Sequence, residues 1–177
     1  MNTYYLNTNE LTEKAKMLKC GDRVFLSGTV YTARDAAHKR IAELIKNGKE
    51  PPFELRGAVI YYAGPTPTPP CLKIGSCGPT TSARMDKYTP DLLNMGVAAT
   101  IGKGERSEEV IKAIKQHHSV YLCAIGGAGA LAATHIKRLE VTAFEDLGCE
   151  SVKKLLFDNF PLTVAIDSSG DSIFFAK

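Results

Sequence analysis

The stretch "DRVFLSGTVYTARDAAHKRIAELIKNGK", residues 22–49, passes from one hydrophobic period to another. Over 22–33 the apolar residues come close to strict alternation, which predicts a β-strand. Over 33–49 the apolar residues from Ala37 to Ile45 recur at three- and four-residue spacing, which predicts one buried helix face. A strand followed directly by a helix is the repeating unit of an α/β protein.

The rest of the chain continues this alternation. We expect strands at 57–64, 71–77 and 97–104, helices at 88–96, 106–118 and 151–160, a proline-rich loop at 65–70, a strand–glycine turn–helix–strand unit over 119–144, and a closing hairpin around 168–171. Ser107 is a candidate N-cap and Gly96 a candidate helix stop. The pattern predicts the α/β class but leaves the strand order open. A length of 177 residues favours one domain over 1–177.

Composition excludes several classes of protein. Hydrophobic residues make up 44% of the chain, enough for a sizeable core, and the net charge is only +3. That balance argues against nucleic acid or a membrane surface as partner. No apolar run approaches the roughly 18 residues that span a bilayer, and the N-terminus does not resemble a signal peptide. We therefore expect a cytoplasmic protein.

The five cysteines are scattered along the sequence and none forms a C-x-x-C pair; they are Cys20, Cys71, Cys77, Cys123 and Cys149. In a reducing compartment they are expected to be free thiols. A zinc or iron–sulfur site built by this chain alone would need clustered ligands, so we expect no metal site within it.

The loop "GSCGPTTSARMDKYTP", residues 75–90, concentrates the groups that bind an oxyanion. Glycines and a proline fix an irregular backbone, and Thr80 and Thr81 bring hydroxyls and backbone N–H groups together. Arg84 adds a planar cation that fits a carboxylate or phosphate. Residue types alone leave an equally good alternative, a turn followed by a helix cap with a solvated arginine.

Two further groups of polar residues follow predicted strands. Lys103 stands between glycines in "IGKGERS", at the carboxyl end of a strand, where α/β proteins commonly bind ligands. Taken alone, a surface lysine in a flexible turn is the better interpretation. Arg34 and His38 lie four residues apart at a strand-to-helix junction and can share one helix face, and Asp35 suits the first helical turn. Taken alone, a single histidine on a helix is more often structural or solvated than catalytic.

The glycines in "AIGGAGALAATH", residues 124–135, imitate a dinucleotide-binding loop without its G-x-G-x-x-G spacing. We interpret them as a tight strand-to-helix turn whose helix packs closely on its neighbours.

Taken together, "TARDAAHKR", "GSCGPTTSARMD", "IGKGERS" and "AIGGAGALAA" resemble, in the same order, the β-subunit of the class I iron–sulfur fumarate and tartrate hydratases. That subunit corresponds to the C-terminal domain of single-chain class I fumarases. The resemblance covers roughly residues 8–175. It implies a swivelling β/β/α domain, with a mixed sheet and flanking helices.

The resemblance also implies a partner and a cofactor. An α-subunit would carry three cysteines that hold a [4Fe–4S] cluster, and this chain matches none of that region. The expected assembly is a larger hetero-oligomer. By analogy with the family, Arg34, Arg84 and Lys103 would bind substrate carboxylates. Thr80 would sit at the reacting carbon and Thr81 beside it.

His38 matches a family histidine and is expected as a second catalytic residue. Cys77, although inside the motif, is interpreted as a small packing residue. The implied reaction is reversible addition of water to a C4 dicarboxylate, most simply fumarate to malate. L-Tartrate dehydration and a non-catalytic anion-binding module remain alternatives.

Overall fold

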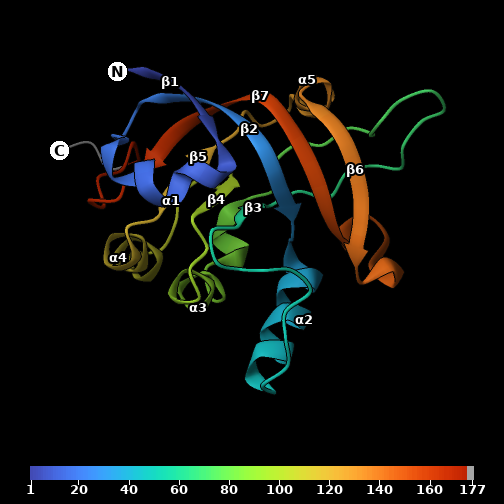
Figure 1. Ribbon diagram of the computed structural model, residues 1–177, viewed down its shortest axis with the longest axis horizontal. Helices are drawn as coiled ribbons and strands as arrows, with labels where there is room; N and C mark the ends of the chain where they lie inside the picture. The colour runs from blue at the N-terminus through green and yellow to red at the C-terminus, as the bar shows by residue number, and fades with distance from the viewer. Residues whose placement is uncertain (175–177) are drawn as a thin grey trace.

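The computed structural model describes residues 1–174 and shows a mixed sheet of seven strands flanked by helices (Figure 1). The strands are β1 (Thr3–Asn7), β2 (Arg23–Thr32), β3 (Val59–Tyr61), β4 (Ala99–Gly102), β5 (Val120–Cys123), β6 (Ile136–Ala143) and β7 (Val152–Ile166). The α-helices are α1 (Leu11–Lys14), α2 (Asp35–Lys46), α3 (Thr89–Asn94), α4 (Glu108–His117) and α5 (Gly129–Thr134). Short 3₁₀ turns are η1 (Thr8–Glu10), η2 (Ala15–Met17), η3 (Ser82–Met85) and η4 (Glu145–Glu150).

Five of the strands close into a ring in the order β2-β3-β4-β5-β7, because β7 pairs with β2 as well as with β5. Strands β2 to β5 run parallel to one another, and β7 is antiparallel to both of its ring neighbours. Strand β1 adds to β2, and β6 adds to β7. The carboxyl ends of four parallel strands therefore meet at one edge of the ring.

Alternate side chains of the ring strands enter two separate cores. Tyr61 packs inside the ring with Phe157 and Phe160, both in edge-to-face contact with its ring. Its neighbours in the chain, Ile60 and Tyr62, face the second core, between the strands and helices α2, α3 and α4. Figure 1 shows these three helices on one side of the sheet. Strand β3 is thus buried on both faces, as expected for a parallel strand covered by helices.

Most of the predicted elements are confirmed. Ser107 caps α4, its Oγ accepting a bond from the Val110 amide at 3.4 Å, and Gly96 ends α3 with φ +94°. The predicted strand at 71–77 is wrong. That segment is the returning leg of a loop, joined to the outgoing leg by a bond from the Thr66 amide to the Ser76 carbonyl.

The predicted helix at 151–160 is also wrong, because this segment is the first part of β7. Leu155 and Phe157 are buried whereas Lys154 and Leu156 are exposed, which is the two-residue period of a strand. β2 pairs with one edge of the segment and β6 with the other. These long-range partners override its local helical pattern.

The closing hairpin is reduced to a turn after β7. Ile166 and Ser172 form an isolated antiparallel bridge, and the last part of the predicted hairpin, 175–177, lies outside the described residues. Over residues 1–174, none of the helices combines the length and apolarity needed to cross a bilayer.

Gly28 provides a test of how β2 is built. Its φ is +112°, and an added Cβ would lie 2.4 Å from Thr8 Oγ1, beside the irregular register with β7. Gly28→Ala is expected to lower the free energy of unfolding by about 2–4 kcal/mol, from backbone strain plus steric overlap. The matched control is Gly48→Ala, at φ +66° with open space around it, which should cost only about 1 kcal/mol. Urea unfolding of both variants measures the difference; equal losses would contradict the overlap.

Candidate active site

The loops that follow β2, β3, β4 and β5 converge at one edge of the ring. Arg34 follows β2, Gly64 follows β3, Lys103 follows β4 and Gly126 follows β5. An added Cβ on Gly64 would lie 3.0 Å from Arg34 Nη1, and one on Gly126 would lie 3.3 Å from Lys103 Cδ. Ligands of open parallel sheets bind at these ends of the strands, and here the two cations lie against glycines that leave room for them.

The loop with the two threonines is bonded directly to the loop that carries Lys103. Thr81 and Lys103 form a parallel bridge, and the Ser82 amide donates to the Lys103 carbonyl at 2.9 Å. The Lys103 amide donates to the Thr80 carbonyl at 3.3 Å and to Ser82 Oγ at 3.1 Å. The Thr80 amide donates to the Tyr62 carbonyl at 2.6 Å. The backbone of Thr80 is therefore held by hydrogen bonds on both sides, which fixes the position of its Cβ atom.

Two carboxylates hold the two arginines of the site. Arg34 Nη2 donates to Glu150 at 2.8 Å, and Arg84 Nη2 lies 3.1 Å from Asp35 Oδ2. The same Asp35 oxygen lies 4.0 Å from Arg34 Nε, so one carboxylate connects both arginines. Arg84 is about half exposed, its side chain keeping 51% of its accessible area, whereas Arg34 keeps 26%. Arg34 is the more rigid cation and Arg84 the more adaptable one.

Glu150 comes from a distant segment, η4, and also caps helix α2. Its second oxygen accepts the Ala36 amide at 2.9 Å, a role that the N-cap residue Arg34 does not fill with its own side chain. Burial works to raise the pKa of Glu150, but the bonds from Ala36 and Arg34 outweigh it and hold that pKa below its ordinary value. Lys153 anchors the same segment by donating to the carbonyls of Gly148 and Cys149. Nothing in the local sequence of 145–153 indicates that Glu150 binds Arg34 and caps α2.

Arg106 is a second residue that the sequence analysis missed. Its side chain is fully buried, and its Nε donates to Asp86 at 2.7 Å. It also donates to the hydroxyl of Thr89 at 2.7 Å and lies over the rings of Tyr62 and Tyr121. Asp86 accepts the Ser107 amide in turn. The one available signal was its place in "GKGER", three residues after Lys103.

This network connects the threonine loop to the loop after β4. The Tyr121 hydroxyl donates to Ser82 Oγ at 2.8 Å, and Ser82 Oγ is the acceptor for the Lys103 amide. Because burying a guanidinium is favourable only with several partners in place, the loops around Arg106 are held in one arrangement.

The His38 ring makes no hydrogen bond to the side chain of any other candidate site residue among residues 1–174; those residues are Arg34, Thr80, Thr81, Arg84 and Lys103. His38 is buried in α2, with its ring against the rings of Tyr62 and Tyr88. Its Nδ1 lies 3.2 Å from the Arg34 carbonyl, which can only accept, so Nδ1 carries the proton. The Nε2 atom is buried without a hydrogen-bond partner. His38 thus contacts the site through the backbone of Arg34.

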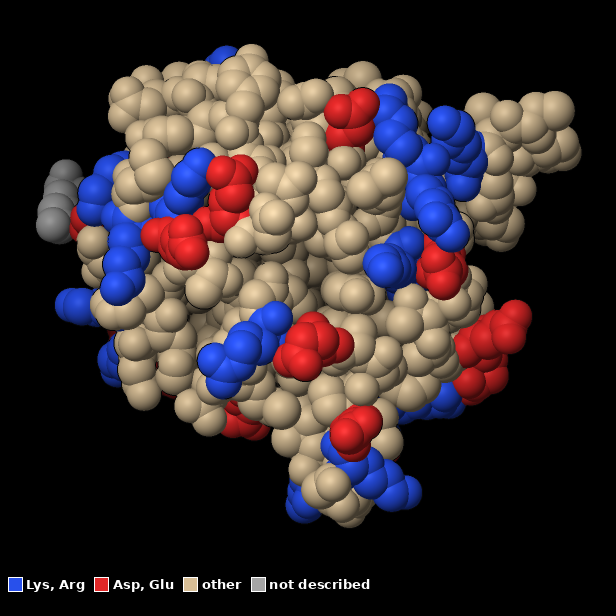
Figure 2. All heavy atoms as spheres, in the orientation of Figure 1, with Lys and Arg blue, Asp and Glu red and all other residues tan. Residues whose placement is uncertain are grey.

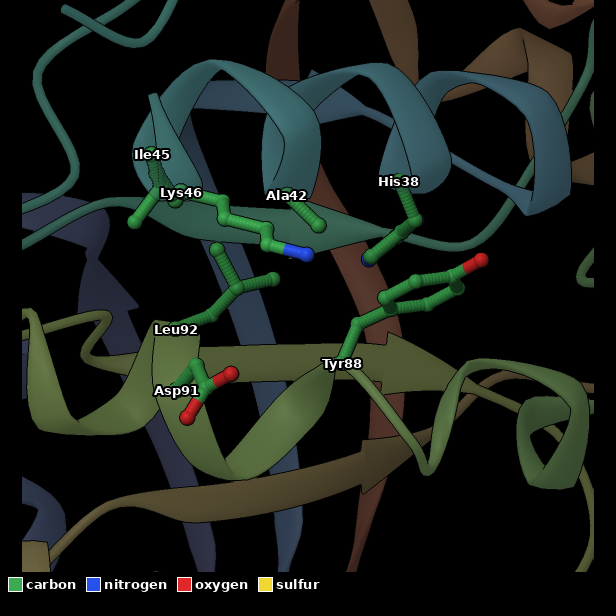
Figure 3. A pocket seen from close by; sticks show the side chains of 7 residues that line it. All are labelled: His38, Ala42, Ile45, Lys46, Tyr88, Asp91 and Leu92. Carbon is green, nitrogen blue, oxygen red and sulfur yellow. The ribbon is translucent and has the colours of Figure 1, made fainter. Parts of the chain in front are cut away.

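On its other side His38 lines a pocket of about 370 Å³ between α2 and α3. Figure 3 shows His38 and Tyr88 at one end of this pocket, with Lys46 and Asp91 farther along it.

The glycine turn after β5 packs closely, as predicted. The Cys77 amide donates to the Gly129 carbonyl at 3.0 Å, and an added Cβ on Gly129 would lie 2.9 Å from the Gly78 amide nitrogen. Cys77 is fully buried, and burial raises the pKa of its thiol to about 12, which fits a packing residue.

The donor set does not fit a metal cluster. No group of three or more His, Cys, Asp or Glu side chains among residues 1–174 is arranged to hold a metal ion. The five cysteines are free thiols at separate places in the fold.

Comparison with known proteins identifies the family to which this chain belongs. A family model described as the fumarase C-terminus matches residues 2–177. The chain therefore belongs to the fumarase C-terminal family, as its motifs predicted.

Named relatives are hydratases and a dehydratase, which are hydro-lyases. A Methanocaldococcus jannaschii protein, named provisionally as the beta subunit of L(+)-tartrate dehydratase, is 42% identical over 94% of this chain and 89% of its own length. The anaerobic class I fumarate hydratase of Escherichia coli is 40% identical over 93% of this chain, and fumarate hydratase 2 of Leishmania major is 40% identical over 94%. The chain spans about 30% of the length of these two fumarate hydratases.

The environment of His38 leads to a prediction about pH and stability. Burial lowers the pKa of His38 to about 4, so the ring stays neutral in the folded protein while the unfolded chain takes up a proton near pH ~6.5. The unfolded state then binds more protons between these values, and stability falls as the pH drops through that window. From about pH 7 to about pH 5 the wild type should lose about 2 kcal/mol more than His38→Gln.

Urea unfolding at both pH values measures this difference. His118→Asn, at the exposed end of α4, is the matched control and should keep the wild-type decline. If the stability of His38→Gln fell as much as that of the wild type, the folded protein would take up a proton on His38 as readily as the unfolded chain does, and the prediction would be wrong.

Proposed function

We propose that this chain is the β-type portion of a class I hydro-lyase that reversibly adds water to fumarate, giving L-malate, in an active site shared with an α-subunit. The observation that carries the proposal is the convergence of three cationic residues and a threonine at the carboxyl ends of four parallel strands; they are Arg34, Arg84, Lys103 and Thr80. The swivelling β/β/α description of the domain belongs to the same proposal, as does a cytoplasmic location for the enzyme.

The three cations fit a substrate with two carboxylates. Arg34 is held by Glu150 and lies against Gly64, so it offers a fixed positive charge. Arg84 and Lys103 are both exposed; Lys103 is paired with Thr81, and Arg84 follows Thr81 by three residues in the same loop. Proton removal from the carbon next to a carboxylate builds negative charge onto that carboxylate. Cations placed there stabilise the charged transition state more than the ground state.

Thr80 is the proposed proton-transfer group. Its backbone is bonded to Tyr62 on one side and to Lys103 on the other. The Cβ atom that carries the hydroxyl is therefore held in a fixed position next to the backbone of Lys103. A threonine hydroxyl is a poor base alone and needs a carboxylate to accept its proton. The nearby carboxylates Asp35, Asp86 and Glu150 are each engaged with an arginine. We assign the accepting carboxylate to the partner chain.

The partner is also the source that we propose for a [4Fe–4S] cluster, because no group of three or more His, Cys, Asp or Glu side chains among residues 1–174 is arranged to hold one. When bound, such a cluster supplies a Lewis acid for the departing hydroxyl. Thr81 is proposed as a substrate-binding neighbour of Thr80. His38, predicted as catalytic, is proposed to act on the site through its bond to the carbonyl of Arg34.

L-Tartrate is the second candidate substrate. The 42% identity to the M. jannaschii protein named for tartrate dehydratase extends over nearly the whole of both chains. Tartrate and malate differ by one hydroxyl, so both substrates fit a clamp of three cations. An anion-binding module without catalysis is the third alternative. Assaying the anaerobically assembled complex with fumarate, malate and tartrate discriminates among the three, and the isolated chain should be inactive with each.

Arg84→Lys tests the carboxylate clamp. The ammonium keeps the charge but cannot grip a carboxylate with two parallel bonds. In the assembled complex kcat/KM should fall by an amount equivalent to about 1.5–3 kcal/mol. Arg34→Ala and Lys103→Ala should act similarly, while Arg56→Lys, on the exposed surface, is the matched control. Wild-type kcat/KM in all three site variants would rule out the clamp.

Thr80→Ala tests the proton-transfer role. Removing the hydroxyl should lower kcat about 10²–10⁴-fold, whereas Thr80→Ser should keep measurable activity. Iron content and subunit assembly should be unchanged, because Thr80 is not a proposed ligand. Thr12→Ala, on exposed α1, is the control. Near wild-type turnover by Thr80→Ala would make Thr80 a turn residue only.

A further inference from the structure

Two uncharged stretches of the chain are exposed beside the candidate site. Residues 64–72, "GPTPTPPCL", and residues 124–134, "AIGGAGALAAT", contain no Asp, Glu, Lys or Arg. Within them Leu72, Ile125 and Leu131 keep 61%, 70% and 59% of their accessible area. Exposed apolar groups gathered in one place commonly mark a protein-binding surface. We call the exposed residues of these two stretches the docking face.

The two stretches lie side by side because helix α5, which belongs to the second stretch, borders a groove together with the loop that contains the first. On one side of α5, a groove of about 360 Å³ is lined by Leu72 and Ile74 of the loop and by Ala130 and Ala133 of the helix. On its other side, Ile125 and Leu131 border a shallower hollow with Phe160 and Pro161. The charged residues that line the larger groove are Lys73 and Lys137, which lie outside the two uncharged stretches.

The docking face is continuous with the candidate site. Gly129, the first residue of α5, is bonded to Cys77 and packs against Gly78, two residues before Thr80. Gly126 lies against the side chain of Lys103. A molecule seated on α5 and its flanking turns therefore lies next to Thr80 and Lys103.

The loop 64–76 is held in shape before any partner binds. Four prolines fix φ at positions 65, 67, 69 and 70, and the Thr66 amide donates to the Ser76 carbonyl at 3.0 Å. The two legs approach so closely that an added Cβ on Gly75 would lie 2.4 Å from the Thr66 carbonyl oxygen. In Figure 1 this loop projects from the body, and in Figure 2 its tip carries no charged group. A prearranged loop loses little conformational entropy on binding.

We propose that the docking face seats the α-subunit of the enzyme. This rests on the function proposed above, in which the partner supplies the carboxylate beside Thr80 and the metal cluster. The chain spans only about 30% of the length of the fumarate hydratases, so most of such an enzyme lies outside it. The docking face lies at the ends of the strands, next to Thr80 and Lys103, so a partner seated there can bring its groups to Thr80. The matching surface of the α-subunit is uncharged and apolar.

The test is the affinity of the purified chain for the purified α-subunit under anaerobic conditions, measured by biolayer interferometry. Ile125→Glu and Leu131→Glu each place a charge in the contact and should raise the Kd at least ~10-fold. Met17→Glu, at a comparably exposed residue of η2, is the matched control and should change the Kd by less than ~2-fold. Circular dichroism should show wild-type folding for all three variants.

Thr80→Ala separates docking from catalysis, since it should bind the α-subunit normally and lose turnover. Docking variants that bind like Met17→Glu would overturn the docking face while leaving the proposed function standing. A self-association of the chain that Leu131→Glu abolishes, without effect on α-subunit binding, would assign the face to a second copy and overturn the proposal too. A third outcome is that the wild-type chain binds the α-subunit, the docking variants weaken this binding, and the complex neither hydrates fumarate nor dehydrates tartrate. That result would confirm the docking face and refute the proposed function.

Discussion

The pairing of β7 with two strands at once is the constraint on which the rest of the structure depends. β7 runs antiparallel to β2 from Arg23 to Thr32 and antiparallel to β5 at its own end. This closes the ring and fixes four parallel strands in register. Because their carboxyl ends then lie at one edge, loops that are far apart in sequence meet there. The convergence of Arg34 and Lys103 follows from this closure.

Within that frame, carboxylates and a buried guanidinium set the geometry of the site. Glu150 holds Arg34 and caps α2, Asp35 holds Arg84, and Arg106 joins the loop after β4, which carries Lys103, to Asp86 of the threonine loop. Each pairing removes some of the freedom that a flexible side chain would lose on binding a substrate. The candidate site is therefore held largely in one arrangement, in which the backbone of Thr80 is bonded to Lys103 and to the loop after β3, and the proposed docking face lies beside it.

Elements were predicted correctly from the sequence where the contacts that determine them lie close together in the chain, and wrongly where those contacts are distant. The strand and helix over 22–49 and the cap at Ser107 were predicted correctly because their signals lie within one or two turns. The segment 151–160 was mistaken for a helix because both of its partners, β2 and β6, lie elsewhere in the sequence. Glu150 was missed for the same reason, since its role depends on Arg34, 116 residues away.

The sequence by itself determined the family, the α/β class and the kinds of side chain at the candidate site, since these depend on residue types and short spacings around Thr80, Arg84 and Lys103. Only the tertiary structure decided the strand order, the closure of the ring by β7 and the burial of His38 against the rings of Tyr62 and Tyr88. The physical reason is that hydrogen bonds between strands and the burial of a polar ring depend on which distant segments are adjacent. Which segments are adjacent depends on how the whole chain packs, and no single stretch of the sequence shows it.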